Sequence, residues 1–218
     1  MMRQKLYVMM GDVMSSRKIK EKEAFRKKLD KVCREINMAY ASDIYANFRI
    51  LKGIDEIEGV LLNISKSYEI MTALSEQLFP QSMRFVIALD YIDTALDTRY
   101  VTKMDGPAFH KASDMIHGLK KTKLFFEMSA GNEALDIAIN GEVNLIMLLK
   151  KNWSIRQHQI VREYREKKNQ DEVAKALGIT QQSVSRTLKR CMWHEIAFIE
   201  EKLNYVLSHY PVRRGDTR

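Results

Sequence analysis

The sequence predicts an α+β domain with a mixed or antiparallel sheet over residues 1–145, followed by an all-α domain over residues 146–218. Short apolar runs typical of strands alternate with amphipathic helical stretches in the first part of the chain. From Gly141 onward every strong periodicity is helical. The positive charge is also concentrated in the last third. We therefore expect a boundary near residues 140–152, within a helix that joins the two domains.

A buried strand and an amphipathic helix are predicted first. Residues 6–10 form an apolar run typical of a buried strand, and Gly11-Asp12 ends it. Residues 20–40 predict a helix, because apolar side chains recur there every three or four positions and define one inward face. Those side chains are Phe25, Leu29, Val32, Ile36 and Ala39.

The next predicted elements are two strands, a helix and a further strand. Residues 47–51 and 57–62 predict strands on either side of a short turn. Ser65 is a candidate cap for a helix that ends near Leu78, before a proline. Residues 84–89 predict another buried strand.

A third helix and a hairpin complete the first domain. Residues 108–121 predict the helix, which follows Asp105-Gly106-Pro107. Residues 124–128 and 134–139 predict two strands joined around Ser129–Asn132. A close hairpin among recurring helices favours an α+β arrangement with a mixed or antiparallel sheet.

The charge of the chain is uneven. The net charge is +8; residues 1–149 hold 21 Lys/Arg against 20 Asp/Glu, whereas residues 150–218 hold 15 against 8. A basic module attached to a nearly neutral one indicates a polyanionic partner for the basic module. The alternative is a basic surface that serves solubility.

Residues 170–190 predict a helix-turn-helix, preceded by a helix over residues 154–168. Glycine accepts the positive φ that a sharp turn between two helices requires, and threonine is a good cap for the second helix. Alanine on the first helix allows the two helices to cross closely. The residues in these roles are Val173, Ala174 and Leu177 on the first helix, Gly178, Ile179 and Thr180 in the turn, and Val184 and Leu188 on the second helix.

The outer face of the second helix carries side chains suited to the major groove of double-stranded DNA. Glutamine can bind adenine and arginine can bind guanine, while serine and lysine reach phosphates or bases. The pattern resembles the helix-turn-helix of bacterial regulators of the sigma-factor region-four kind. The alternative is a helical bundle used for protein contacts. The predicted DNA-binding residues are Thr180, Gln181, Gln182, Ser185, Arg186, Lys189 and Arg190.

A long helix is predicted from Met192 to Tyr210. Its apolar residues follow a heptad-like spacing, which favours a dimerisation helix and hence a homodimer, although a helix packed on its own chain would show the same pattern. The residues of this seam are Met192, Ile196, Ile199, Leu203, Val206 and Tyr210.

Asp12 and Asp55 are candidate ligands of a metal ion. Asp12 ends the first strand and Asp55 lies in the turn between the next two, so the two carboxylates could share one rim of the sheet and hold Mg²⁺ with a phosphate. The alternative is that both are surface turn aspartates.

Three segments, YVMMGDVMSSR, GIDEIEGVL and DGPAFHKA, precede the predicted helix-turn-helix in this order, and with them the chain resembles the SatD family. The first part of that family is similar to the palm fold of class III nucleotidyl cyclases, whose two metal-binding aspartates correspond here to Asp12 and Asp55. The resemblance implies a ferredoxin-like or palm-type sheet domain followed by an all-α helix-turn-helix domain.

The sequence departs from the cyclase pattern in two places. Ile54 stands where SatD-like sequences tend to have glycine. His110 and Asp114 stand where the cyclases have the asparagine and arginine that stabilise the transferring phosphate, and an aspartate cannot neutralise phosphate charge. His110 near Asp105 could be a general base or a metal ligand, and the alternative is a partly buried histidine with a local hydrogen bond.

We therefore expect a DNA-binding transcriptional regulator whose palm-like domain senses a small-molecule or nucleotide ligand or holds a dimer. No cofactor is assigned, and Mg²⁺ with a nucleotide is the candidate. The alternative is a metal-dependent enzyme that binds or processes a nucleotide. Cys33 and Cys191 have no metal-ligand spacing and are expected to be buried free thiols. No apolar run is long enough for a membrane helix, and we expect a cytoplasmic protein.

Overall fold

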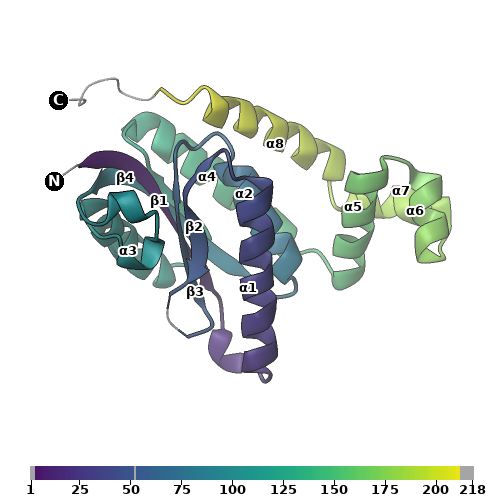
Figure 1. The fold of residues 1–218 in the computed structure, drawn as a ribbon. Helices are drawn as coiled ribbons and strands as arrows, with labels where there is room; N and C mark the ends of the chain where they lie inside the picture. The colour runs from purple at the N-terminus through teal and green to yellow at the C-terminus, as the bar shows by residue number, and fades with distance from the viewer. Residues whose placement is uncertain (1–2, 52, 212–218) are drawn as a thin grey trace. The chain divides into compact units, whose positions relative to one another are not determined.

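A computed structural model describes residues 3–51 and 53–211. Within these residues the chain divides into two compact units (Figure 1). The first unit comprises the residues up to Asn144 together with those from Asn204 onward, and the second comprises Leu145–Leu203. The helix assigned by sequence to the end of the second domain is therefore divided between the units, and residues 212–218 of that predicted domain lie outside the described residues.

The described residues of the first unit contain one sheet of five strands, in the order β2-β3-β1-β4-β5. β1 is antiparallel to β3 and to β4, β2 is antiparallel to β3, and β5 is parallel to β4. The strands are β1 (Gln4–Val13), β2 (Ile44–Ile50), β3 (Glu56–Leu61), β4 (Met83–Ile92) and β5 (Phe126–Ser129).

Helices join these strands in the order of a ferredoxin-like fold. α1 (Lys22–Ala39) connects β1 to β2, and α2 (Ser67–Leu78) connects β3 to β4. α3 (Pro107–Lys120) follows β4 after 3-10 turns at Leu96–Thr98 and Val101–Lys103; another such turn, Ser16–Lys18, precedes α1. The predicted α+β class with a mixed sheet is thus confirmed.

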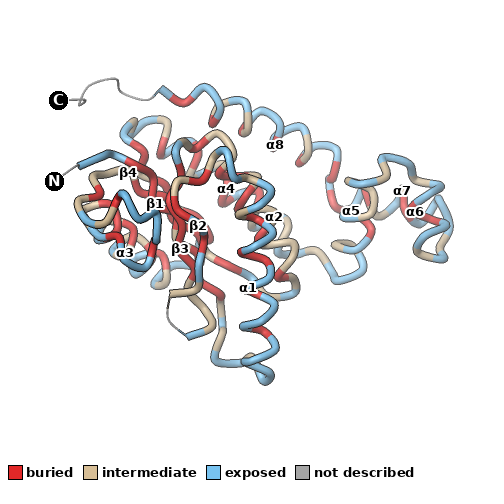
Figure 2. Tube along the Cα trace, viewed as in Figure 1, coloured by how far each residue is buried: buried red, intermediate tan, exposed pale blue. Residues whose placement is uncertain are grey.

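Each face of the sheet is covered by helices (Figures 1 and 2). Alternate side chains of a strand point to opposite faces, so each strand contributes to two apolar layers. α3 packs on the layer that contains Val8, Val60 and Val86, with its own Ala112 and Ile116 buried there. α1 and α2 lie together on the other side of the sheet. Red tubes in Figure 2 mark this buried interior.

The predicted hairpin over 124–139 is wrong in its second strand. β5 is present, but residues 134–139 belong to α4 (Glu133–Lys151). Ile139 and Val143 are buried four residues apart, which is the spacing of a helix face. Asn144 explains why β5 needs no further strand beside it. Its Oδ1 accepts hydrogen bonds from the backbone N–H groups of Phe125 and Phe126, and its amide donates to the carbonyl of Phe126.

Asp136 anchors the end of the described chain to the first unit. Its buried carboxylate accepts hydrogen bonds from the backbone N–H of Ala130 and from the hydroxyl of Tyr210, at 3.0 Å and 2.7 Å. Burial, followed by the hydrogen bond to Asp136, raises the pKa of Tyr210. Asn132 N–H also donates to Tyr210 Oη. These contacts explain why the residues from Asn204 onward group with the sheet.

Ser65 does not cap α2 as predicted. The helix begins at Ser67 after Lys66, which makes no side-chain capping bond. The backbone N–H and hydroxyl of Ser65 instead donate to the side chain of Asn63, two residues earlier. A local turn therefore competes for the polar side chain that the sequence suggested as a cap.

The second unit is helical, as predicted. α5 (Ile155–Lys167), α6 (Gln170–Leu177) and α7 (Gln181–Arg190) pack around one apolar cluster. Ser154, Asn169 and Thr180 each accept hydrogen bonds from backbone N–H groups in the first turn of the helix that follows. The residues that bury this cluster are Ile160, Val161, Val173, Ala174, Val184, Leu188, Cys191 and Trp193.

The last helix, α8 (Trp193–Ser208), does not bury the whole predicted seam. Met192 is 48% exposed and Ile199 is 38% exposed. Three residues of the predicted seam, Ile196, Leu203 and Tyr210, are buried. Three residues outside it, Trp193, Glu200 and Leu207, are buried as well. Glu200 forms an ion pair with Lys150 of α4 within the second unit. The dimer that the seam suggested stays a prediction.

The two cysteines, Cys33 and Cys191, are free and buried, as expected. Among the described residues, no helix combines the length and the apolar character that crossing a membrane requires.

Candidate functional site

Three charged residues lie side by side at one end of the sheet. Asp12 of β1 is the register partner of Glu56 of β3 and of Arg84 of β4. Their side chains project from the same face, because directly opposed residues of antiparallel strands share a face. This is the face that α3 covers. The strand pairing therefore builds a row of acid, acid and base across β3, β1 and β4.

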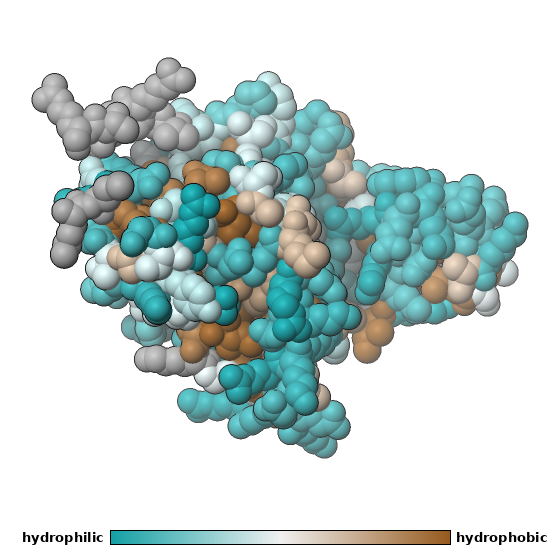
Figure 3. Space-filling view, viewed as in Figure 1, coloured by the Kyte–Doolittle hydropathy of each residue, from teal (hydrophilic) through white to brown (hydrophobic). Residues whose placement is uncertain are grey.

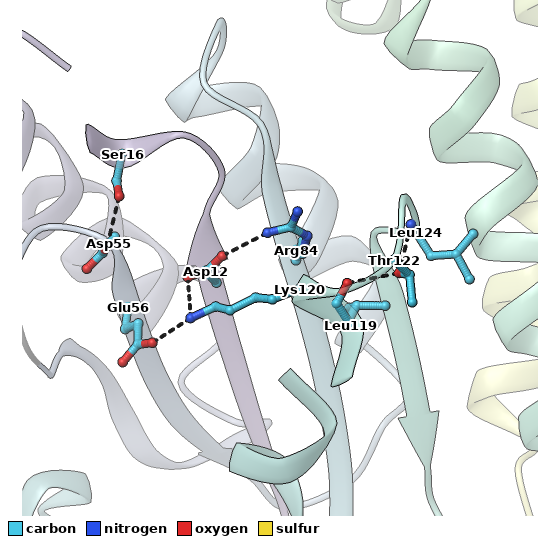
Figure 4. Close-up of polar contacts among 9 residues, drawn as sticks. All are labelled: Asp12, Ser16, Asp55, Glu56, Arg84, Leu119, Lys120, Thr122 and Leu124. Carbon is cyan, nitrogen blue, oxygen red and sulfur yellow. Dashed lines mark hydrogen bonds and ion pairs between the residues drawn. The ribbon is translucent and has the colours of Figure 1, made fainter. Parts of the chain in front are cut away.

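Lys120, the last residue of α3, lies over this row (Figure 4). Its Nζ is 2.9 Å from Asp12 Oδ1 and 2.9 Å from Glu56 Oε1. Arg84 Nη1 is 3.3 Å from the other carboxylate oxygen of Asp12, which is only 5% exposed. Burial opposes the charge of Lys120, but hydrogen bonds to Asp12 and Glu56 outweigh it, so the pKa of Lys120 is raised. We call Asp12, Glu56, Arg84 and Lys120 the charge cluster.

Asp55 is next to this cluster in the chain, but its side chain has a different partner. Its Oδ2 accepts a hydrogen bond of 2.8 Å from Ser16 Oγ, and its backbone carbonyl accepts one of 2.7 Å from Val13 N–H. Figure 4 shows the Asp55–Ser16 pair apart from the contacts of Asp12. The structure thus brings the two predicted aspartates to one rim, and pairs each with groups of the chain itself.

This arrangement does not fit a divalent metal ion. A site for Mg²⁺ requires carboxylate oxygens that are free to face the ion. Here Lys120 and Arg84 already neutralise Asp12, and Ser16 occupies Asp55. In the part of the chain that the structure describes, no group of three or more His, Cys, Asp or Glu side chains could hold a metal ion.

The sequence did not indicate that Lys120, Arg84 and Glu56 are part of this site. Arg84 and Glu56 stand at strand starts and could be placed beside Asp12 only through the register of three strands. Lys120 is 108 positions from Asp12, and nothing local in the sequence joins them. A lysine at the end of an amphipathic helix is already explained by the favourable interaction of a positive charge with the helix carboxy terminus.

Glu58 is a further buried acid on the same face of the sheet, two residues after Glu56 on β3. It is 4% exposed and lies opposite Met10 in the register. Burial, followed by the nearby charges of Glu56 and Asp105, raises the pKa of Glu58 to about 7. The carboxyl group therefore changes its protonation close to neutral pH.

His110 and Asp114 lie on α3, and neither reaches the charge cluster in the contacts described. His110 Nε2 is 3.0 Å from Asp105 Oδ1, with both side chains well exposed. Asp105 also accepts a hydrogen bond from Gly106 N–H. Asp114 is exposed. The local hydrogen bond expected for His110 is therefore present at the start of α3, but the side chain is exposed and not partly buried as predicted.

The predicted DNA-binding residues all lie at α7 or directly before it. Thr180 accepts a hydrogen bond from Ser183 N–H and so caps the helix. Val184 and Leu188 lie on the apolar side of α7 and are buried in the core of the unit, whereas Ser185 is half-buried. The exposed residues of the predicted set are Thr180, Gln181, Gln182, Arg186, Lys189 and Arg190.

A fold-level class follows from these observations: an α+β protein with a ferredoxin-like sheet unit and a separate helical unit. The model of the SatD family matches residues 7–202. The chain therefore belongs to the SatD family.

Two solved structures show a weak structural similarity to this chain. A bacterial light-regulated adenylyl cyclase has 15% identity and a TM-score of 0.43, over 60% of this chain and 78% of that one. A regulator of polyketide synthase expression from Bifidobacterium adolescentis has 9% identity and a TM-score of 0.30, over 96% of this chain and 82% of that one. Neither likeness supports a conclusion about activity. A comparison with curated proteins finds no match.

Proposed function

We propose that this protein is a transcriptional regulator that binds double-stranded DNA through α6 and α7. The observation that carries the proposal is the surface of α7. Its apolar side is buried against the other helices of the unit, while Gln182, Arg186 and Lys189 project from the opposite side. Spacings of four and three residues place these side chains on one surface. A helix of this kind can enter the major groove.

The turn before α7 supports the same proposal. Gly178 ends α6 with φ 62° and ψ 39°, a left-handed conformation that glycine adopts readily. Ala174 on α6 is 6% exposed and belongs to the same apolar cluster as Val184 and Leu188 of α7. A small residue there keeps the two helices close. The second helix is thereby held by its neighbours, with its polar side in solvent.

The charge distribution suits a polyanion. Residues 150–218 carry 15 of the 36 Lys/Arg of the chain against 8 of its 28 Asp/Glu. On the face seen in Figure 3, the second unit is covered mostly by hydrophilic side chains. Lysine and arginine contacts to phosphates release counterions, so binding should weaken steeply as the salt concentration rises.

In this proposal the sheet unit senses a small-molecule or nucleotide ligand or holds a homodimer. The charge cluster disfavours a metal-dependent enzyme, because Asp12 is already paired with Lys120 and Arg84.

The test begins with selection of genomic DNA fragments bound by the full chain, followed by affinity measurement on a selected duplex at several salt concentrations. The double variant Arg186→Ala, Lys189→Ala should lose DNA retention and keep the circular dichroism spectrum and Tm of the parent. The matched control is Lys22→Ala, Arg26→Ala, which removes the same charge from exposed positions of α1.

The control should bind DNA like the parent apart from a small general effect of net charge. If the α7 double variant binds like the parent, α7 is not the recognition helix. If the parent shows no salt-sensitive affinity for any duplex, DNA binding itself is wrong, and the alternative of a helical bundle for protein contacts takes its place.

A further inference from the structure

The first residues of α6 and α7 are both glutamines, and their side chains are joined. Gln181 Nε2 donates a hydrogen bond of 2.7 Å to Gln170 Oε1. The two residues are eleven positions apart, so the bond links the starts of two different helices. A hydrogen bond between amides that water can reach contributes little net stability. Its effect is on the orientation of the Gln181 side chain.

The backbone under both glutamines is held in place by the preceding residue. Asn169 accepts hydrogen bonds from the first-turn N–H groups of Asp171 and Glu172. Thr180 accepts one from Ser183 N–H, and the two hydroxyls are 2.8 Å apart. The polar side chains of Asn169 and Thr180 are thereby committed to capping. Gln170 and Gln181 are the next polar side chains at the two helix starts.

We infer that Gln170 is a positioning residue that orients the Gln181 amide to read an adenine in the major groove; this inference rests on the proposed function. A glutamine amide has two N–H donors and one carbonyl acceptor. The bond to Gln170 uses one N–H of Gln181. The other N–H and the carbonyl oxygen remain, and these match the N7 acceptor and the N6–H donor of adenine.

The direction of the bond decides which base is favoured. If Gln170 presented a donor instead, the carbonyl of Gln181 would turn toward it and both N–H groups would face the groove. Two donors match the O6 and N7 acceptors of guanine. An acceptor at position 170 therefore holds Gln181 in the orientation for adenine, and removal of that acceptor leaves the amide free to turn.

The variants follow from this geometry. Gln181→Ala removes the reader and identifies which base pair of a selected duplex it contacts. Gln170→Ala removes the acceptor, and Gln170→Glu keeps an acceptor that can only accept. Gln159→Ala is the matched control, because Gln159 is an exposed glutamine of α5 in the same unit. Affinities are measured by fluorescence anisotropy for duplexes that carry each of the four base pairs at the identified position.

For the parent we expect roughly a tenfold or greater preference for adenine at that position, which Gln181→Ala abolishes. Gln170→Ala should reduce the preference about two- to tenfold, the cost of ordering one free side chain on binding. Gln170→Glu should retain the adenine preference, although its charge weakens binding to all duplexes alike. Gln170→Ala should have no further effect on base preference once Gln181 is alanine, and the Tm should stay unchanged throughout.

The inference is overturned if Gln170→Ala keeps the full preference, if its effect persists in the Gln181→Ala background, or if the identified base is not adenine. These outcomes differ from failure of the proposed function, in which the parent itself has no sequence-selective, salt-sensitive affinity. That failure overturns both proposals. Normal DNA binding with no role for position 170 overturns this one alone.

Discussion

The ammonium group of Lys120 lies 2.9 Å from the carboxylate of Asp12 and bridges it to Glu56. It ties the last residue of α3 to the row of charges formed by β3, β1 and β4. Asp12 is buried, so a charge partner offsets the cost of removing its carboxylate from water. The rim where the sequence predicts a metal ion therefore carries cations that belong to the chain.

Replacing Lys120 should destabilise the first unit. Lys120→Met keeps most of the apolar stem and removes the charge, which leaves Asp12 with Arg84 alone and Glu56 without its ion pair. The loss should be about 1–2 kcal/mol in the free energy of unfolding, less than for a fully buried pair because Lys120 is 31% exposed. Urea denaturation measures it. Lys121→Met, an exposed neighbour, is the control, and equal losses in both variants would contradict the role of Lys120.

Magnesium should bind weakly or not at all to the parent protein. Asp12 and Asp55 are already paired, so an ion would have to displace Lys120 and Ser16. Calorimetric titration with Mg²⁺, alone and with purine nucleotides, should give no heat beyond dilution in the parent and in Asp12→Asn. A Mg²⁺-dependent signal that disappears in Asp12→Asn would instead support the metal-dependent enzyme.

Stability should fall as the pH rises through neutrality because of Glu58. Burial raises the pKa of this carboxyl to about 7, from an ordinary value of 4.5, so between these pH values the folded chain binds more protons than the unfolded chain. The stabilisation is present below pH 4.5 and is lost as the pH rises through 7. Glu58→Gln should remove this dependence and raise the free energy of unfolding at pH 8 by up to about 3 kcal/mol.

Urea denaturation between pH 4 and pH 8 measures the effect of Glu58→Gln. Glu23→Gln is the control, because Glu23 is exposed on α1. A difference between Glu58→Gln and the parent that stays constant over this range would show that Glu58 has an ordinary pKa.

Asn144 should be among the most sensitive polar positions of the first unit. Its side chain is 6% exposed and bonds the backbone of Phe125 and Phe126. Asn144→Ala leaves those backbone groups without partners, which should cost about 3 kcal/mol in the free energy of unfolding. Hydrogen exchange at the amides of Phe125 and Phe126 should accelerate. Asn47→Ala, at an exposed position of β2, should change neither quantity, and slow exchange in Asn144→Ala would refute the assignment.

Most elements could be predicted because their sequence signals are local. The helix over 20–40 has one apolar face, and the same spacing survives in α1, where Phe25, Leu29 and Ile36 are buried. The cap at Thr180 and the turn at Gly178 were also predictable, since each depends on residues within one helical turn. Short apolar segments are less clear. The sequence of residues 134–139 predicts a strand. The structure shows a helix there, whose Asn144 side chain bonds the backbone N–H groups of Phe125 and Phe126 at β5.

By itself the sequence determined the α+β class, the helical nature of the second unit and the exposed polar side of α7, because these depend on periodicity, on turn residues and on the distribution of charge. Only the tertiary structure decided the partners of Asp12, the face of α8 that is buried, and the link between Gln170 and Gln181. The physical reason is distance along the chain. A period of two or 3.6 residues is visible in a short window, whereas strand register and helix packing join residues that no local pattern relates.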